Sequence, residues 1–405
     1  MALKEQFQVS GRYKTWSLAL SGIGVLSLII SYFIYGTGDE QARVRFWSML
    51  LQNSVYFLLV VNAAMFFICA TTLAMGGWQM SFRRVTEAIS VAVIPLGLIA
   101  LVILLALVFG HQHDIYHWLT PEGDKLLEGK SGFLNPTFFT VWTVLSIGLW
   151  ILLGSRMRKL SRSLDENPIQ SVEEGKQYVF KTTVAASLYI VWFALTVAST
   201  TPWFWLMSID AHWFSTMYSW YTFASSFVAG LALITLFVIY LKNTGYLELV
   251  NEEHLHDLGK FMFAFSIFWT YLWFSQFMLI WYANIPEETV YFKPRLQGAY
   301  KGIFWLNLII NFLAPLLVLM KRNSKRSYAT LTFISVFIIF GHWLDFYQMV
   351  FPGPMDGQLE LGILDFGLAL GFIGLIMFST GRALSKHPLY AKNHPFFKET
   401  IIHHT

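Results

Sequence analysis

Residues 208–221 read SIDAHWFSTMYSWY and lie between two long apolar runs, 182–200 and 217–241. A helix rises about 1.5 Å per residue, so each run is long enough to cross the hydrocarbon core of a bilayer. Charged side chains are costly inside a bilayer and occur mainly where they pair or function. Asp210 and His212 therefore mark a membrane face between two crossing helices.

The composition of the whole chain agrees with this interpretation. Hydrophobic residues make up 56% of the 405 residues and charged ones 13%, against roughly 25% charged in an average soluble domain. The fold class that we expect is an all-α integral membrane protein with about ten transmembrane helices, and residues 1–405 form a single polytopic unit. The predicted spans are 15–36, 46–74, 86–110, 136–155, 182–201, 215–241, 259–282, 301–320, 328–350 and 362–381.

The order of the spans predicts two blocks of four. Residues 46–201 are expected to form a first four-helix bundle and residues 215–350 a second, since both blocks begin on the same side of the membrane. The spans 15–36 and 362–381 then flank the bundles. The charged stretch 156–181 contains proline and glycine, and predicts a loop with only a short surface helix.

The basic residues orient the chain. With the N-terminus in the cytoplasm, 21 of the 28 lysines and arginines fall in cytoplasmic segments and 7 fall outside, as the positive-inside rule requires. The run 16–35 lacks a small-residue cleavage site and is expected to stay as a helix. Both termini are therefore expected to be cytoplasmic. The segments predicted to lie outside are 111–135, 202–214, 283–300 and 351–361.

Several chemistries are excluded by the sequence. Cys69 is the only cysteine, so no disulfide framework, CxxCH haem site or iron–sulfur ligand set exists. The basic residues cluster at helix ends, which argues against nucleic-acid binding. His111, His113 and His117 form a weak metal pattern on an outer loop, but no metal site is expected there. A membrane haem needs two facing histidines, and only His342 lies deep in a span.

The ninth span contains the most informative polar pair. In GHWLDFYQ (341–348), His342 and Asp345 are three residues apart and share one helical face, which Gln348 continues. A neighbouring carboxylate can orient an imidazole and raise its proton affinity. Two interpretations remain open: a buried pair that ties the helix to a neighbour, or a pair that exchanges protons or contacts a quinone.

Three further residues are predicted at a similar depth in the outer half of the membrane. Asp210 and His212 are two residues apart and would face nearly opposite ways on a regular helix, and Asp365 begins the tenth span. Each alone could be a helix cap or an interfacial side chain. Together with His342 and Asp345 they predict a shared site that forms an outer proton path.

Other polar residues offer weaker signals. Glu87, predicted to contribute to the proton path in the inner half, follows Arg83 and Arg84 and could equally be a capped helix start paired with arginine. Stripes of polar residues predict hydrogen bonds between helices or contact with a water path. They comprise Asn307 and Asn311 in one span, and Ser266, Thr270, Trp273 and Gln276 in another.

Aromatic residues gather in the outer connections. Trp203, Trp205 and Trp213 flank Asp210. Tryptophan prefers the membrane interface because its ring is apolar while its N–H can bond water. These rings are expected to anchor the protein, with quinone or lipid contact as the alternative.

Two phrases carry a family resemblance. SIDAHWFSTMYSWYTFASS (208–226) and FAFSIFWTYLWFSQFMLIWYANIPEE (263–288), together with the ten-span plan, resemble the membrane subunits of bacterial alternative complex III. The wider relatives are the NrfD or polysulfide-reductase membrane anchors. The resemblance extends over nearly the whole chain and implies two four-helix bundles with an extra helix at each end.

The resemblance also implies a function. It places the chain in a quinol:cytochrome c, or quinol:electron-acceptor, oxidoreductase of the bacterial inner membrane. The expected partners are an iron–sulfur subunit, haem c subunits, a second NrfD-like subunit and a terminal oxidase. This chain would supply scaffold, a proton path and contact with menaquinone, quinol or phospholipid, without a redox centre of its own. The alternatives are a secondary transporter and a purely structural membrane anchor.

Overall fold

The computed structural model describes residues 4–110, 112–355 and 357–404. Helices hold 78% of the chain, and no strand occurs in the described part. Within the described residues, ten helical segments are long and apolar enough to cross a membrane. The all-α fold with about ten apolar spans, predicted from the sequence, is thereby confirmed.

Three crossing segments are divided: α3 and α4 by a short turn, and the other two by the π-helices Thr196–Thr200 and Ile309–Leu313. The bounds of the crossing segments are α1 (Gly11–Ser31), α2 (Glu40–Leu73), α3 with α4 (Arg83–Ser90 and Val93–Phe109), α6 (Pro136–Glu166), α7 with α8 (Val172–Leu195 and Thr201–Trp205), α9 (Met217–Asn243), α10 (Glu252–Ala283), α13 with α14 (Lys301–Leu308 and Ala314–Leu319), α15 (Tyr328–Val350) and α16 (Ile363–Leu384).

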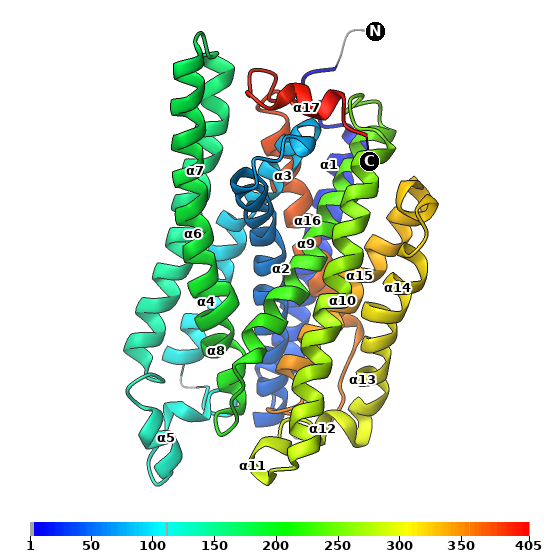
Figure 1. Cartoon of the computed structure of the whole chain (residues 1–405). Coiled ribbons are helices and arrows are strands. Elements are labelled where there is room, and N and C mark those ends of the chain that lie inside the picture. The colour runs from blue at the N-terminus through cyan, green and yellow to red at the C-terminus, as the bar shows by residue number, and fades with distance from the viewer. Residues whose placement is uncertain (1–3, 111, 356, 405) are drawn as a thin grey trace.

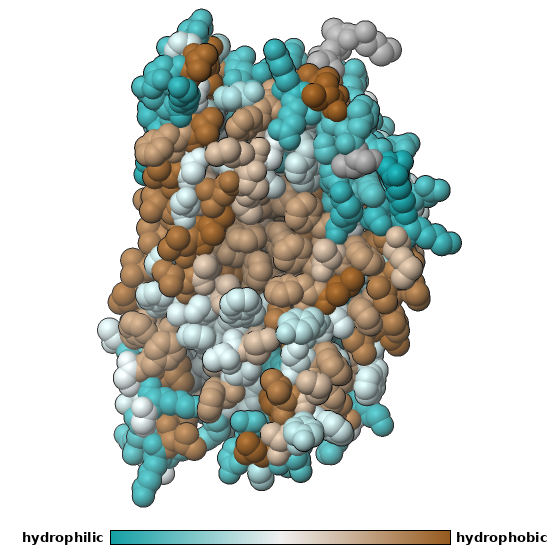
Figure 2. Space-filling view, in the orientation of Figure 1, coloured by the Kyte–Doolittle hydropathy of each residue, from teal (hydrophilic) through white to brown (hydrophobic). Residues whose placement is uncertain are grey.

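Short helices mark the two ends of the molecule. We call the end that carries α17 (Phe397–Ile401) and both termini the terminal end, and the opposite end the distal end (Figure 1). The distal end carries α5 (Lys125–Lys130), α11 (Pro286–Thr289) and α12 (Lys293–Leu296). Figure 2 shows hydrophobic side chains gathered over the middle and hydrophilic ones at both ends, which is the surface of a multi-pass membrane protein.

Helices α6 and α7 differ from the sequence prediction. The stretch 156–181 was predicted to be a loop with a short surface helix, but α6 continues to Glu166 and α7 begins at Val172. Arginine, lysine and glutamate are good helix formers, so α6 extends beyond the apolar run. Ser171 then caps α7 by accepting a hydrogen bond from the N–H of Glu174.

The crossing helices contact one another in two closed rings. In the first ring α2 contacts α4 and α7, and α6 joins these two. In the second ring α9 contacts α10 and α15, and α14 joins these two. Helices α2 and α9 connect the rings and are the most buried spans, each 83% buried over its apolar window against 22% for α1. Gly230 allows their close approach, since a Cβ there would lie 2.7 Å from that of Ala63.

The two flanking helices pack against each other although they lie at opposite ends of the chain. A Cβ on Gly24 of α1 would lie 2.2 Å from the Cα of Gly371 on α16, so only glycine fits at this crossing. The backbone extends the pairing beyond the helices, because the N–H of Leu389 donates to the carbonyl of Glu5 at 2.7 Å.

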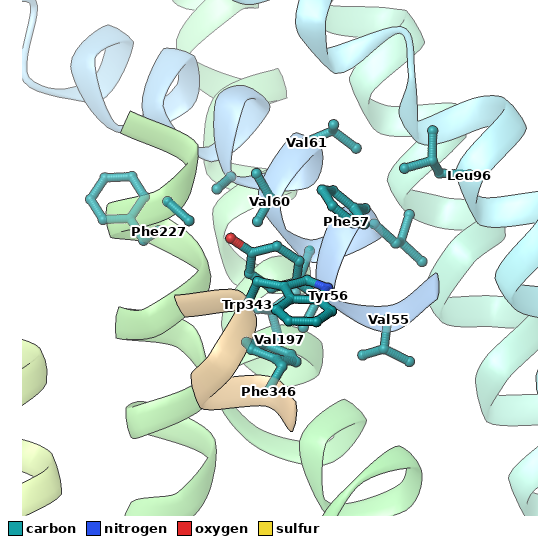
Figure 3. Packing of buried hydrophobic residues seen from close by; sticks show 14 of the residues in the cluster. Val55, Tyr56, Phe57, Val60, Val61, Leu96, Val197, Phe227, Trp343 and Phe346 are labelled. Atoms are coloured by element: carbon teal, nitrogen blue, oxygen red, sulfur yellow. The ribbon is translucent and has the colours of Figure 1, made fainter. Parts of the chain in front are cut away.

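Helix α15 reaches from the second ring to α2. Figure 3 shows Tyr56 of α2 beside Trp343 and Phe346 of α15. The Tyr56 hydroxyl donates to the carbonyl of Ile339 at 2.6 Å, and Trp343 Nε1 donates to Asn53 Oδ1 at 2.9 Å. These bonds satisfy polar groups that have no water to bond with in a membrane interior. They also fix the rotation of α15, and so the direction in which His342 and Asp345 point.

Candidate functional site

Asp345 lies at the centre of a hydrogen-bonded network inside the second ring. Its Oδ1 accepts from Asn307 Nδ2 at 2.7 Å and from the hydroxyl of Tyr221, and its Oδ2 accepts from Ser225 Oγ at 2.8 Å and Trp269 Nε1 at 2.9 Å. The side chain has no exposed surface. Four neutral donors thus surround one carboxylate, and none of them is a lysine or an arginine.

His342 reaches this network through Ser225. Its Nδ1 lies 2.9 Å from Ser225 Oγ but 3.9 Å from Asp345 Oδ2. Because the serine donates its only hydrogen to Asp345, the imidazole Nδ1–H must be the donor to Ser225. The other ring nitrogen, Nε2, is buried and has no hydrogen-bond partner. A neutral ring leaves an unpaired acceptor there, whereas a protonated ring would bury an unpaired donor with its charge.

Helical spacing explains how these residues converge. Tyr221 and Ser225 are four apart on α9, as are Asn307 and Asn311 on the segment that includes α13 and α14, so each pair shares a face. Asn311 Nδ2 donates to Asn307 Oδ1 at 2.5 Å, which orients the amide that binds Asp345. The segment Ile309–Leu313 forms a π-helical turn, a feature frequent at functional sites. The polar stripe predicted in this span therefore meets Asp345.

A small cavity lies next to the network on its distal side. It has a volume of about 20 Å³ and is lined by Tyr221, Gln276, Arg295 and Gln348, among others. The Nε2 atoms of Gln276 and Gln348 are buried and have no hydrogen-bond partner in the protein. A cavity of this size holds about one water molecule, for which the two amides and the tyrosine supply polar partners.

Arg295 connects the cavity to Asp210. Its Nη2 lies 3.4 Å from Asp210 Oδ2, and its Nε donates to the carbonyl of Gln348 at 2.9 Å. The guanidinium carbon also lies 3.4 Å from the centre of the Tyr291 ring. Burial lowers the pKa of Arg295, but Tyr291 and Asp210 outweigh burial and raise it. Arg295 is therefore a permanent cation between Asp210 and the cavity.

Asp365 belongs to a separate group. Its Oδ2 lies 3.1 Å from Arg45 Nη2 and accepts from the N–H of Gly362 at 2.8 Å, so it also caps the start of α16. Arg45 further pairs with Glu360 at 3.0 Å. Asp365 thus has a cation and a capping role, and no hydrogen bond links it to Asp345.

His212 also lies apart from the network. Its Nε2 lies 2.5 Å from Asp124 Oδ2, and its side chain is 54% exposed. The hydrogen bond with His212 lowers the pKa of Asp124, as do the backbone N–H groups of Leu126 and Leu127 at the start of α5. Asp210 and His212, two residues apart, thus face different partners. The five residues predicted to share one site, Asp210, His212, His342, Asp345 and Asp365, therefore lie in separate places. Only Asp210 connects with His342 and Asp345, through Arg295 and the small cavity.

Glu87 occupies a second buried network at the terminal end. Its two carboxylate oxygens pair with Arg83 Nε at 3.1 Å and Arg84 Nη1 at 3.0 Å. Arg84 also donates to both oxygens of Asp165 at 2.8 Å. The pairing with arginine at a helix start, foreseen as one interpretation of Glu87, is the arrangement in the structure.

The three tryptophans separate into two sites. Trp203 and Trp213 line a cavity of about 360 Å³ at the distal end, and neither Nε1 has a hydrogen-bond partner. Trp205 has no exposed surface and its Nε1 donates to Thr143 at 3.0 Å. The ring of Trp205 is thus enclosed and its polar atom is engaged, and the alternative of quinone or lipid contact stays a prediction for these tryptophans.

Sequence reasoning missed the residues whose partners come from distant segments. Arg45 and Arg295 pair with the predicted carboxylates, but each lies over 80 residues from its partner. Trp269 was also missed, although it shares a helical face with Ser266, Trp273 and Gln276 and could have been included in their stripe.

Comparison with known proteins gives no match, either to a protein-family model or to a curated protein.

Proposed function

We propose that this chain is a multi-pass subunit of a quinol:electron-acceptor oxidoreductase of the bacterial inner membrane, with both termini in the cytoplasm, and that the Asp345 network forms part of a proton path. The sequence resemblance to alternative complex III supports the choice of complex. It also supplies the proposed partners: iron–sulfur and haem c subunits, a second NrfD-like subunit and a terminal oxidase. Electrons would pass through those partners.

The observation that carries the proton path is the carboxylate of Asp345, buried without an arginine or lysine partner. A structural carboxylate in a membrane is normally neutralised by a cation, as Asp365 is by Arg45. Neutral donors leave the carboxylate able to accept a proton without breaking an ion pair.

The neighbouring groups offer a route to Asp345. It would start at the small cavity, whose lining includes Tyr221, a donor to Asp345. Arg295 keeps its proton and only holds Asp210 near this cavity. From Asp345 the route continues through the Ser225 hydroxyl to His342. A hydroxyl conducts a proton by accepting one hydrogen and donating another, and an imidazole conducts it between its two nitrogens.

The distal cavity favours quinone contact as an additional role. Its volume of about 360 Å³ falls within the range of small-molecule sites, and its walls include Phe133, Trp203 and Trp213. The indole N–H groups of the two tryptophans have no partner, and a quinone carbonyl is an acceptor that would satisfy them. These residues would hold and orient the ring, and bound quinol would supply the electrons that the partners accept.

The proton role is tested with the assembled complex in proteoliposomes. Asp345→Asn keeps the side-chain shape but removes the ionisable proton. We expect the variant to assemble and to lose proton translocation per electron. Asp257→Asn, which changes another buried carboxylate near the terminal end, is the control and should pump normally. Normal pumping by a fully assembled Asp345→Asn, His342→Gln variant would reject the proton role.

Quinone contact is tested with the single variants Trp203→Phe and Trp213→Phe and with the double variant that combines them. Loss of one hydrogen bond costs about 1 kcal/mol, so each change should raise the KM for quinol about five-fold while kcat stays unchanged. Trp220→Phe, at an exposed ring on α9, is the control. An unchanged KM in the double variant would rule out quinone binding in this cavity.

A further inference from the structure

A second large cavity lies at the terminal end, between the start of α4, the last turns of α6 and the segment that follows α16. Its volume is about 620 Å³, and its walls include Ile94, Arg158, Lys159, Arg162 and His387. About 20 helical residues span the hydrocarbon core, whereas α6 has 31. Counted from Pro136, the residues of α6 beyond about 155 therefore lie at the level of the lipid headgroups.

Two arginines in this cavity have no carboxylate bound to them. Arg158 is buried, and donates to Ser90 Oγ at 3.0 Å and Ser155 Oγ at 2.8 Å. The Nε of Arg162 is buried and has no hydrogen-bond partner. A buried guanidinium N–H without an acceptor is costly, so an acceptor from outside the chain would stabilise this arrangement.

The carboxylates nearby leave an excess of positive charge. Asp165 and Glu87 are paired with Arg84 and Arg83. Against the three cations of α6, Arg158, Lys159 and Arg162, the cavity lining has two carboxylates, Asp165 and Glu166, and Asp165 is already paired with Arg84.

His387 adds no further charge to the cavity. Burial lowers its pKa, and Arg162 and Arg84 lower it further, so the ring is neutral at pH 7. The cavity therefore carries an excess of two positive charges.

An apolar stripe continues from the cavity toward the distal end. On α4, Leu98 and Val102 follow Ile94 at four-residue intervals and are 54% and 68% exposed. On α6, which contacts α4, Leu152 and Leu145 are also exposed. A ligand whose anionic group enters the cavity would thus have apolar surface for long hydrocarbon chains directly beside it.

We propose that this cavity binds the phosphodiester headgroup of an anionic phospholipid, with the acyl chains along the exposed stripe of α4 and α6. The three cations would attract free phosphate as well as the phosphate of a lipid. Only a lipid has acyl chains that the apolar stripe can contact, so the stripe favours the lipid. The assignment depends on the membrane location of the chain and not on its role in respiration.

Native mass spectrometry of the purified protein, after exchange into detergent with added phosphatidylglycerol or phosphatidylcholine, tests the site. Lys159→Gln, Arg162→Gln should weaken retention of phosphatidylglycerol about 30-fold, which corresponds to roughly 1 kcal/mol for each cation. Phosphatidylcholine retention should not change. The matched control is Arg156→Gln, Lys321→Gln, which removes two exposed cations at the same end outside the cavity. Equal retention by the cavity variant and the control would overturn the proposal.

A measurement on the unmodified protein covers the case in which the variant fails to fold. Phosphatidylglycerol with a photoreactive group near its phosphate should crosslink to peptides that contain residues 155–166, and excess unlabelled phosphatidylglycerol should abolish the product. Crosslinks confined to other segments would overturn the site. Competition by inorganic phosphate at equal molar excess would show that the cavity takes free phosphate and would overturn the lipid assignment.

Discussion

Asp345 and Glu87 are both buried carboxylates, but their surroundings differ in kind. Glu87 is held by Arg83 and Arg84, which donate from the same short helix. Asp345 is held by hydroxyl, amide and indole groups from other crossing segments. An ion pair fixes the charge state of its members, whereas neutral donors do not. Burial alone therefore does not distinguish a structural carboxylate from one suited to exchange protons; the chemistry of its partners does.

Replacement of Asp345 by an apolar residue should have the largest effect. In Asp345→Leu four buried donors lose their acceptor, at about 1–3 kcal/mol each, so the free energy of unfolding should fall by roughly 4–12 kcal/mol and little folded protein should remain. Asp345→Asn should lose only about 1–3 kcal/mol, because Tyr221, Ser225 and Asn307 can reorient to accept from the new amide. Thermal unfolding in mild detergent measures both. Equal stability of the two variants would contradict the network.

The arginine-paired site should depend on charge more than on shape. Glu87→Gln preserves volume but leaves Arg83 without its carboxylate, and breaking a buried ion pair in this way costs about 3–5 kcal/mol. Asp165→Asn is a useful control, since Asp165 is 21% exposed and Arg84 keeps Glu87. If Glu87→Gln lowers the free energy of unfolding less than Asp345→Asn does in the same assay, charge matters less at Glu87 than at Asp345 and the contrast between the two sites is contradicted.

The stability of the region around the Glu87 network should also depend on pH. His394 is 7% exposed, lies against Tyr178 and is near Arg83, Arg84 and Glu87. Burial, then Arg83, lowers its pKa from 6.5 to about 3. The neutral ring stabilises the fold above pH 6.5, and this contribution is lost as the pH falls toward 3 because the unfolded chain binds the proton first.

Between pH 7 and pH 5 the loss assigned to His394 is on the order of 2 kcal/mol. The difference in unfolding temperature between pH 7 and pH 5 should therefore be smaller in His394→Gln than in the unmodified protein. Identical pH profiles for the two proteins would show that the ring titrates normally.

The exposed pair at the distal end should contribute least. His212→Gln removes the partner of Asp124, but both side chains reach solvent, where ion pairs stabilise little. We expect the unfolding temperature and proton translocation to match those of the unmodified protein. Loss of translocation in this variant would mean that the proton path includes the surface pair, and would extend the network beyond Asp210.

The sequence was sufficient to predict the membrane spans and the residue pairs that lie within one helix. Apolar length identifies the ten crossing segments, and three-residue spacing places His342 and Asp345 on one face. It was not sufficient for contacts between segments. Arg45 and Arg295 reach their carboxylates through packing that no local pattern encodes, whereas helical spacing could have placed Trp269 in the polar stripe of its span but not beside Asp345. The extension of α6 and α7 was missed for the opposite reason, since polar helices beyond a membrane lack the apolar signal that marks a span.

The packing of α1 against α16 bears on how the protein is made. A ribosome synthesises roughly 330 residues between the end of α1 and the start of α16, which takes about 20–70 s at bacterial and eukaryotic elongation rates of roughly 5–20 residues per second. For that time the glycine and serine face of α1, including Gly24 and Ser27, meets lipid or other helices in place of its partner. Helix α1 thus docks only after α16 has been made, and biosynthesis must protect its small-residue face until then.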